Sequence, residues 1–392
     1  MHLIVLEREV TSTRGGQELN LFEICRSLSQ RGHRITLLYE RPGDLLDQYR
    51  EFCDEIINVQ SYGFDRRSFS STLKFIPSMA QVWQVPVTDE TIVFINDYHF
   101  ALFGYALSYF RNLPYVCYCQ IPPCDFNRQR RFGLSRVDQF VAVSHQTKQE
   151  WVDYGYPSDK IAVVHNGTDV EKFKPAENWQ QLRQQWDVAN DATLISYIGR
   201  IDVEKGLETL IKASAILVNQ GADLQIRIAG KPVVHYSAEK GVECEEEGMK
   251  YQRSLVDLAQ SLGIGDRVKF LGHVSPPVLL YQASDVTVLP SVWKEPFGRS
   301  IIESLACGTP VVASRIGGIP EILTGSLADC LAAPGDETDL ATRLAQTMTW
   351  RKTNPQLGAQ CRQHVIDHFS YESMVDGIER VSLQFKPLLQ VG

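Results

Sequence analysis

The stretch DVTVLPSVWKEPFGRSIIESLACGTPVVAS, residues 285–314, contains an apolar run, a loop, an amphipathic segment and a second apolar run. The apolar runs are typical of buried parallel strands, and the segment between them predicts a helix that begins near Gly298. Two carboxylates, Glu295 and Glu303, lie on either side of that helix start. The stretch therefore predicts a strand–helix–strand unit of an α/β sheet with two acidic side chains at its turn.

The same alternation extends along the rest of the chain. Apolar runs predict strands at 2–7, 34–40, 91–96, 115–119, 139–144 and 161–167, and again at 193–200, 224–230, 267–272, 285–291 and 309–314. Amphipathic periodicity predicts helices at 15–33 and 206–221, and the polar stretch 168–192 predicts a linker with a short helix. A chain of 392 residues is too long for one ordinary core. The expected fold class is α/β, with two tandem Rossmann-like parallel-sheet domains.

Composition limits the class of protein. The chain is 44% hydrophobic and 22% charged, as globular proteins are, and its net charge of −8 gives no support for nucleic-acid binding. Nine scattered cysteines favour a reducing compartment. The N-terminus turns charged too soon for a signal peptide, and no apolar run reaches about twenty residues. We therefore expect a cytoplasmic location.

Three cysteines, Cys117, Cys119 and Cys124, lie close together in the sequence. Their spacing does not match that of a zinc finger, although metal ligation stays open. Buried thiols on a strand are the simpler interpretation.

Ligands of parallel sheets bind beyond the carboxyl ends of the strands, where loops lead into helices. One such loop offers Arg200 and Lys205, and another leads into the helix expected near Gly298. A helix N-terminus with two nearby cations attracts anions, and a diphosphate fits this chemistry. Glu303 would then accept hydrogen bonds from ribose hydroxyls, and Glu295 from hydroxyls on the group that the diphosphate carries. The alternative is that both glutamates are surface charges.

Several segments together resemble one family. The pair GRIDVEKG (199–206) and EPFGRSIIE (295–303) is similar to the signature of the retaining GT-B glycosyltransferases, which carry a Glu-x7-Glu motif. The resemblance continues in RGGQELNLFEICRSLSQRGHRITLL (14–38), VAVSHQTKQEWVDYGYPSDKIAVVHNGTD (141–169), GTPVVASRIGGIPEIL (308–323) and HFSYESMVDGIERV (368–381). It covers nearly the whole chain, and its motifs are specific as a set.

The resemblance implies a GT-B fold, in which two Rossmann-like domains face each other across a cleft. An acceptor-side domain is expected at 1–172, a donor-binding domain at 173–370, and a C-terminal helical segment that packs back on the first domain at 371–392. Glu295 would contact the transferred sugar. The residues expected to bind a nucleotide-sugar donor are Gly16, Arg200, Lys205, Gly230, Lys231, Val274, Phe297, Gly298, Arg299 and Glu303.

The acceptor side departs from the family at one position. Many relatives have a histidine after the strand at 115–119, where this chain has Gln120, whose amide cannot exchange a proton at neutral pH. Asp97 and His99, together with Asn96, follow the preceding strand and are further candidates for a catalytic or sugar-contacting role, although an ordinary helix start explains His99 equally well.

No metal or other cofactor is expected. The sequence has no Asp-x-Asp pair, which metal-dependent enzymes of this kind use as oxygen ligands. Fixed cations and a helix dipole can stabilise the same leaving-group charge.

Two charged segments are expected at the surface. The arginines Arg128, Arg130, Arg131 and Arg136 would suit an anionic acceptor, a peripheral membrane contact or a solvated helix face. The acidic stretch 239–252 predicts an exposed loop.

The predicted function is metal-independent sugar transfer, with retention, from a nucleotide-diphosphate sugar to a glycan, lipid-linked or small-molecule acceptor. The alternatives are a nucleotide-sugar epimerase, a phosphorylase or a non-catalytic nucleotide-sugar binding protein. Gln120 motivates the last of these.

Overall fold

A computed structural model describes residues 1–12, 15–63, 69–124, 126–232, 235–237, 242–244 and 246–385. The chain divides into two compact units. Unit 1 is Met1–Gly167 together with the C-terminal segment that starts at Tyr371, and unit 2 is Thr168–Ser370. The domain boundaries at 172/173 and 370/371 remain predictions.

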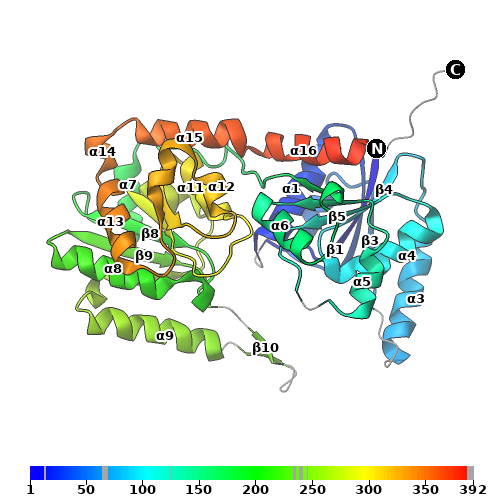
Figure 1. Ribbon diagram of the computed structural model, residues 1–392, viewed down its shortest axis with the longest axis horizontal. Coiled ribbons are helices and arrows are strands. Elements are labelled where there is room, and N and C mark those ends of the chain that lie inside the picture. Colours follow the sequence, from blue (N-terminus) through cyan, green and yellow to red (C-terminus); the bar gives the residue numbers. More distant parts are fainter. Residues whose placement is uncertain are drawn as a thin grey trace. The chain divides into compact units, whose positions relative to one another are not determined.

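Unit 1 is built on a seven-stranded sheet in the order β3-β2-β1-β4-β5-β6-β7, and each neighbouring pair is parallel (Figure 1). Its strands are β1 His2–Glu9, β2 Arg34–Arg41, β3 Glu55–Asn58, β4 Thr91–Ile95, β5 Tyr115–Cys119, β6 Gln139–Ala142 and β7 Ile161–Val163. Its α-helices are α1 Gly16–Gln30, α2 Leu46–Arg50, α3 Phe69–Trp83, α4 Ala101–Arg111, α5 Arg128–Leu134, α6 His145–Asp153 and α16 Tyr371–Leu383.

Unit 2 repeats this plan on a six-stranded parallel sheet in the order β12-β9-β8-β13-β14-β15. Its strands are β8 Thr193–Ile198, β9 Leu224–Ala229, β12 Val268–Gly272, β13 Val286–Leu289, β14 Val311–Ser314 and β15 Leu331–Ala332, with a separate antiparallel pair, β10 His235–Ser237 and β11 Val242–Cys244. Its α-helices are α7 Trp179–Arg183, α8 Leu207–Asn219, α9 Glu246–Ser261, α10 Val278–Ala283, α11 Arg299–Ala306, α12 Ile319–Ile322, α13 Glu337–Thr347, α14 Trp350–Thr353 and α15 Leu357–His368.

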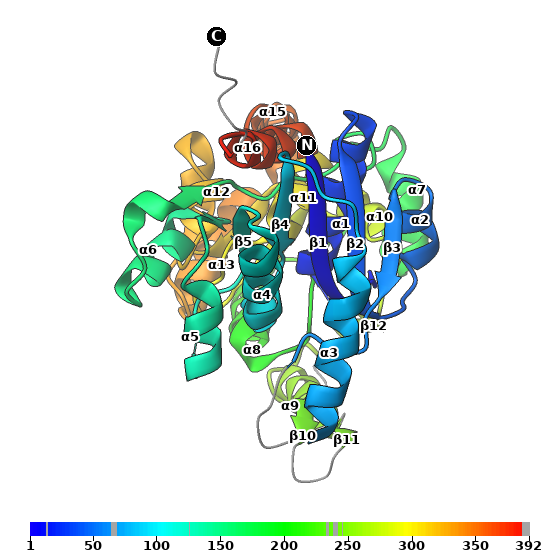
Figure 2. The same cartoon turned by 90° about the vertical axis from the view of Figure 1, so that its right-hand side faces the viewer.

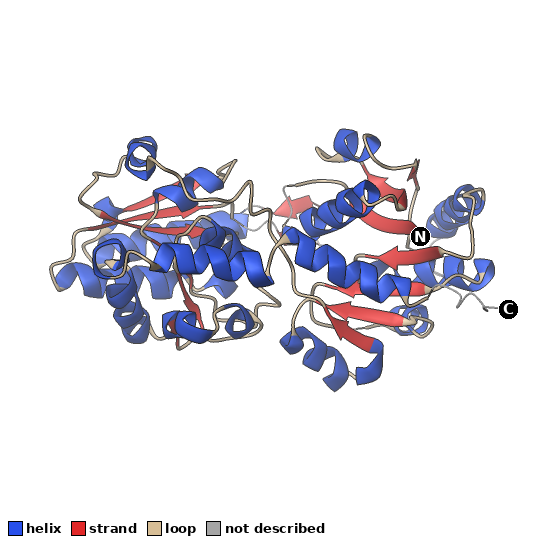
Figure 3. Ribbon diagram, turned by 90° about the horizontal axis from the view of Figure 1, so that it is seen from above, coloured by secondary structure: helices blue, strands red, loops and turns tan. Residues whose placement is uncertain are grey.

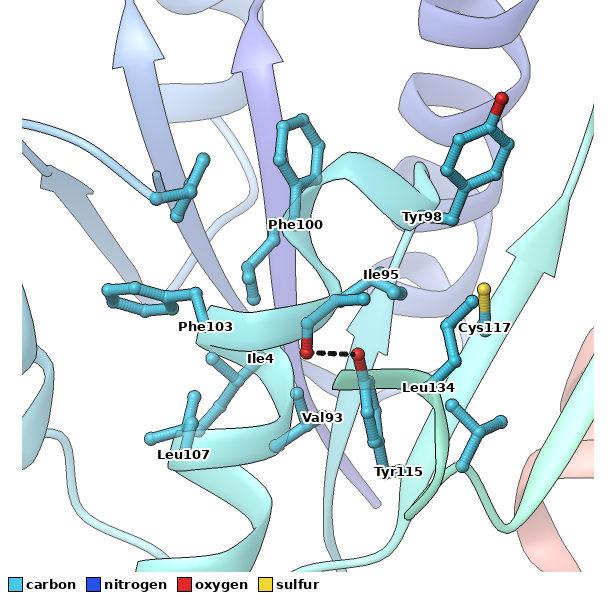
Figure 4. Packing of buried hydrophobic residues seen from close by; sticks show 14 of the residues in the cluster. Ile4, Val93, Ile95, Tyr98, Phe100, Phe103, Leu107, Tyr115, Cys117 and Leu134 are labelled. Carbon is cyan, nitrogen blue, oxygen red and sulfur yellow. Dashed lines mark hydrogen bonds between the residues drawn. The ribbon is translucent and has the colours of Figure 1, made fainter. Parts of the chain in front are cut away.

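Helices cover both faces of each sheet, which explains why the strands are continuous apolar runs (Figure 3). In unit 1, side chains of β1, β4 and β5 pack against α4 in a core that includes Ile4, Val93, Phe103 and Leu107 (Figure 4). The hydroxyl of Tyr115 is buried in this core and donates to the carbonyl of Ala101 at 3.1 Å. The predicted fold class is thereby confirmed for each unit.

One predicted loop is wrong where the structure describes it. Residues 239–241 and 245 lie outside the described residues, but β11 covers 242–244 and α9 begins at Glu246. The buried residues Leu255 and Ala259 that anchor α9 lie beyond residue 252. The stretch 239–252 therefore ends before the helical periodicity becomes visible.

The C-terminal helix completes unit 1. Helix α16 packs against α1, and Glu379 of α16 accepts hydrogen bonds from Arg31 at 2.6 Å and from His33 at 2.6 Å. These two partners lower the pKa of Glu379 below its ordinary value.

Among the described helices, none combines the length and apolar character needed to cross a membrane.

Candidate functional site

The strand order of unit 2 reverses between β8 and β13, which are neighbours in the sheet although they lie far apart in the sequence. Crevices for ligands form at such a reversal, beyond the carboxyl ends of the two strands. The loop after β8 carries Arg200 and Lys205, and the loop after β13 carries Glu295 and leads into α11. The fold thus places the predicted donor loops next to each other.

Backbone contacts hold these two loops together. The N–H of Val292 donates to the carbonyl of Glu204 at 2.9 Å. Gly206 has φ 65°, and a Cβ at this position would lie 2.1 Å from the carbonyl oxygen of Pro290. Only glycine therefore permits this close approach, which sets the position of Lys205 relative to the loop after β13.

The approach joins Lys205 and Glu295 in an ion pair. Lys205 Nζ donates to Glu295 Oε1, and Ser291 Oγ donates to the same oxygen at 2.6 Å. The side chains of Lys205 and Glu295 are 12% and 8% exposed, so water screens this pair weakly. The residue assigned to a phosphate and the residue assigned to a sugar therefore lie in direct contact, with Oε1 committed to protein donors.

Helix α11 begins at Arg299, as predicted, after Gly298 with φ 119°. One turn inside, Glu303 accepts from Arg299 Nε at 2.8 Å through Oε1 and from the hydroxyl of Tyr281 at 2.9 Å through Oε2. Burial and the adjacent carboxylate raise the pKa of Tyr281 well above its ordinary value. Tyr281 therefore stays protonated and keeps Glu303 in a fixed orientation.

A third loop, which follows β14, contacts the backbone of Glu295. The N–H of Gly318 donates to the carbonyl of Glu295 at 2.8 Å. Gly317 has φ 60°, and a Cβ there would lie 2.2 Å from that same carbonyl oxygen. The absence of a side chain at Gly317 therefore lets the loop approach the backbone of Glu295 closely.

Three further donor-binding predictions, Arg200, Gly230 and Lys231, fall at the same edge of the sheet. Arg200 is exposed, and its carbonyl accepts from the hydroxyl of Tyr197 at 2.5 Å. Gly230 has φ 154° at the end of β9, and a Cβ there would lie 1.7 Å from the carbonyl of Gly199. Lys231 follows it and is exposed. Gly230 therefore shapes the ends of two neighbouring strands.

Three other predicted residues are placed differently. Val274 is half-buried after β12. Phe297 is buried, with its ring 5.8 Å from that of Phe369, so the structure gives this ring a packing role. Gly16 is the first residue of α1 and belongs to unit 1, whereas the other predicted donor residues belong to unit 2.

Unit 1 has its own strand-order reversal, between β1 and β4, and neutral amides line it. Gln120 Nε2 donates to Asn96 Oδ1 at 2.6 Å and to the carbonyl of Gln17 at 3.1 Å, and its Oε1 accepts from Asn20 Nδ2 at 2.8 Å. Both amide protons of Gln120 are thus used inside the protein. This side chain, only 7% exposed, is built into a network.

The network ends on a buried carboxyl group. Glu7 Oε2 accepts from Asn96 Nδ2 at 2.8 Å, and its Oε1 accepts from the N–H of Arg8 at 2.7 Å. Burial raises the pKa of Glu7 from 4.5 to about 8, and the charge of Glu18 acts in the same direction. Glu7 is therefore mostly protonated at neutral pH.

Asp97 and His99 lie at the end of β4, beside this network. Asp97 Oδ1 accepts from both the backbone N–H of His99 at 2.9 Å and from its ring Nδ1 at 2.6 Å. The ring of His99 is exposed and borders a cavity of about 320 Å³ within unit 1. The other residues that line the cavity are Arg8, Glu40, Ser61, Tyr62, Gly63, Phe100, Leu102, Asn127, Gln129 and Arg130.

The three clustered cysteines separate in the structure. Cys117 and Cys119 are buried on β5, as predicted, but the prediction of a buried strand thiol is wrong for Cys124, which is exposed in the loop after β5. The Sγ of Cys124 lies 3.1 Å from the hydroxyl of Tyr98.

Comparison with known proteins assigns the chain to a family. Residues 14–172 match the model for "Glycosyltransferase Family 4", and residues 179–364 match the model for "Glycosyl transferases group 1". The two matches follow one another and cover nearly the whole chain. The chain belongs to the family 4-like GT-B glycosyltransferases.

Curated members of this glycosyltransferase family are moderately similar in sequence. A D-inositol 3-phosphate glycosyltransferase of Saccharomonospora viridis is 32% identical over 235 residues, which are 57% of this chain and 50% of the relative. An N-acetyl-alpha-D-glucosaminyl L-malate synthase of Bacillus anthracis is 27% identical over 255 residues, which are 65% of this chain and 62% of the relative. The matched region thus spans about half the length of the first of these relatives.

Solved structures show the same GT-B fold. Anabaena HepE in complex with UDP and glucose superposes with a TM-score of 0.78 at 21% identity, over 97% of this chain and 98% of HepE. Sucrose-phosphate synthase from Thermosynechococcus elongatus gives a TM-score of 0.76 at 22% identity, over 98% of both chains.

Sequence reasoning missed several residues at both sites of this glycosyltransferase. In unit 2 these are Ser291, Tyr281 and the glycines Gly317 and Gly318; in unit 1 they are Glu7, Gln17 and Asn20. Three of these could have been recognised in the sequence: the adjacent glycines Gly317 and Gly318 after a strand indicate a close backbone approach, and Glu7 is a carboxylate within an apolar strand. Tyr281 and Asn20 gave no such signal, because each lies on a helix whose sequence does not show what its side chain meets.

Proposed function

We propose that this chain transfers a sugar from a nucleotide-diphosphate sugar to an acceptor, with retention at the anomeric carbon and without a metal ion. One observation carries the proposal: unit 2 gathers Lys205, Glu295 and the N-terminus of α11 at its strand-order reversal. Cations and free N–H groups suit a diphosphate, and carboxylates suit sugar hydroxyls.

In the proposed reaction, the bond between the anomeric carbon and the phosphate oxygen breaks while the acceptor oxygen bonds to that carbon on the same face. The departing phosphate oxygen takes the acceptor's proton. Arg200, Lys205, Arg299 and the α11 N–H groups would stabilise the charge that develops on the diphosphate. Glu303 would hold the ribose and Glu295 the transferred sugar.

The proposed acceptor carries an anionic group and binds in the cavity of unit 1. Arg8 and Arg130 line this cavity beside His99, and Arg8 Nε lies 3.9 Å from Oε2 of Glu40, which lines it too. The names of two curated relatives include acidic molecules, D-inositol 3-phosphate and L-malate. Glycan, lipid-linked and small-molecule acceptors all remain within this proposal, and the cytoplasmic location stays a prediction.

A panel of labelled nucleotide sugars tests the donor assignment. We expect slow release of nucleoside diphosphate from one of them without an acceptor, unchanged by EDTA. Glu295→Gln should reduce this release, whereas Lys212→Ala, an exposed position on α8, should keep it. Binding of a nucleotide sugar with no hydrolysis or transfer would indicate a non-catalytic binding protein, and interconversion of two nucleotide sugars would indicate an epimerase. Once an acceptor is found, NMR of the product's anomeric proton tests retention.

A further inference from the structure

Exposed apolar side chains gather on three consecutive helices of unit 1. Each of the following is more than half exposed: Leu73, Ile76 and Trp83 on α3, Tyr109 and Phe110 on α4, and Phe132 on α5. Single exposed apolar residues are ordinary, but a contiguous group marks an interaction surface. We call these six residues the apolar face.

Helix α3 shows that this exposure is a pattern. Leu73, Ile76 and Trp83 are spaced by three and seven residues, so they lie on one side of the helix. The opposite side faces the core, where Val82 is buried and the ring of Phe75 lies 5.4 Å from that of Phe103. The helix is thus apolar on both sides, and only the inner side is covered by the described residues of unit 1.

Helices α5, α4 and α3 lie beside one another (Figure 2), and side-chain contacts join them. The ring of Tyr105 lies 4.4 Å from that of Phe132 and 5.8 Å from that of Tyr109, which links α4 to α5. Arg111 of α4 lies over the ring of Trp83 at 5.2 Å and donates to the carbonyl of that residue at 3.0 Å, which links α4 to α3.

The charged residues of these three helices are all basic. No residue of α3, α4 or α5 is acidic, whereas five are basic: Lys74, Arg111, Arg128, Arg130 and Arg131. The whole chain carries a net charge of −8, so this region runs against the average. An anionic surface is the complementary partner.

We propose that the apolar face and its five cations dock unit 1 on a membrane surface that contains anionic lipids. Tyrosine and tryptophan favour the interface between headgroups and acyl chains, apolar side chains gain by insertion, and basic side chains are attracted by anionic headgroups. A second copy of the chain is a poorer occupant, because a two-fold contact would place the same five cations against each other.

The docking surface continues into the candidate acceptor cavity. Helix α4 follows directly on the loop that carries Asp97 and His99, and Leu102 of α4 and Arg130 of α5 line the cavity. A docked unit 1 would therefore hold its cavity beside the lipid headgroups. The docking does not depend on the proposed sugar transfer, and binding to vesicles can be measured without any turnover.

Flotation of the full chain with vesicles tests the proposal. We expect at least tenfold more protein to float with vesicles of phosphatidylcholine and 30% phosphatidylglycerol than with phosphatidylcholine alone, and most of this gain to disappear in 0.5 M salt. Ile76→Ser combined with Phe110→Ser, at positions 62% and 64% exposed, should reduce flotation at least tenfold. Lys74→Glu combined with Arg128→Glu should do the same.

The matched control is Met249→Ser combined with Leu262→Ser, which removes two exposed apolar side chains of unit 2 and should float like the wild type. All variants should keep the wild-type melting temperature, because the replaced side chains are exposed. Equal flotation with both kinds of vesicle would overturn the proposal, and so would wild-type flotation of both face variants. A dimer in gel filtration that Ile76→Ser with Phe110→Ser dissolves, without vesicle binding, would assign the face to a second copy instead.

Discussion

The two units of this glycosyltransferase share the strand order around the point where their sheets reverse. The side chains at that point are ionic in unit 2 and neutral in unit 1. In unit 2, between β8 and β13, a cation and a carboxylate pair directly, Lys205 with Glu295, and a second pair follows inside α11. In unit 1, between β1 and β4, the equivalent position holds the amides of Asn96 and Gln120 and the largely protonated Glu7.

This difference teaches that the topology supplies a place and the side chains supply its charge. Parallel sheets bring loops together at the reversal whatever their sequence is. Fixed ionic groups there can exchange their internal partners for a charged ligand. An amide network that is satisfied within the protein instead maintains a rigid, neutral surface.

The largest expected effect concerns the ionic side of the comparison. Lys205→Ala should weaken nucleoside diphosphate binding by roughly ten- to a hundredfold, because a hydrogen bond to a charged group contributes about 1.5–3 kcal/mol. Arg200→Ala should act in the same direction. Calorimetric titration with UDP, GDP and ADP measures this, and Lys212→Ala is the control. Wild-type affinity in Lys205→Ala would remove the ionic assignment of unit 2.

The second effect separates the two carboxylates of unit 2. Glu303→Gln should weaken binding of free nucleotide by about tenfold, since its proposed partner is the ribose. Glu295→Gln should reduce turnover without weakening free nucleotide binding, since its proposed partner is the sugar and its loss releases Lys205 from the ion pair. Titration with nucleoside diphosphate, set beside turnover of the nucleotide sugar, measures both. Equal losses of nucleotide affinity would show that the two residues do not divide the ligand in this way.

The third effect concerns Glu7, the protonated carboxyl group at the reversal point of unit 1. The carboxyl of Glu7 has a pKa of about 8 in the fold, against 4.5 for its ordinary value. The folded state therefore binds the extra proton, and its stability should fall as pH rises from about 4.5 to about 8, by at most about 1.4 kcal/mol per pH unit. Glu7→Gln should flatten this part of the dependence. Melting temperatures between pH 5 and 8 measure it, with Glu9→Gln on the same strand as the control; parallel curves for wild type and Glu7→Gln would contradict it.

The smallest effect concerns Gln120. A neutral hydrogen bond contributes about 0.5–1.5 kcal/mol, so Gln120→Ala should lower turnover by up to about tenfold. Gln120→His should keep substantial activity without a new pH dependence near 6.5. Gln120→Glu should be worse than Gln120→Ala, because its carboxylate would face the oxygens of Asn96 and Gln17. If Gln120→His instead created activity in an inactive wild type, the chain would be a binding relative that had lost its chemistry.

Sequence reasoning succeeded where the signal is local. The apolar runs that became β1 and β13 are buried on both faces, and the helix start at Arg299 follows a glycine with a left-handed backbone. Helix α9 shows the limit of this reasoning, because its polar beginning hides the buried Leu255 and Ala259 further along.

Partnerships between distant residues could not be predicted. Lys205 and Glu295 are separated by 90 positions, and Asn20 and Gln120 by 100. Their types and their strand-end positions were visible in the sequence, but the pairing depends on which strands become neighbours and how closely the loops approach. The sequence likewise gave no reason to expect that Gln120 would donate both amide protons to other groups of the protein.

The return of α16 to unit 1 affects how the chain is made. Domains of a nascent protein ordinarily fold in the order in which they leave the ribosome. Here the helix that covers α1 and pairs with Arg31 and His33 is synthesised only after the whole of unit 2. The first sheet must therefore wait, with part of α1 uncovered, until the whole of unit 2 has been synthesised. A chain whose synthesis stops before Tyr371 would leave α1 partly uncovered and unit 1 open to chaperones and proteases.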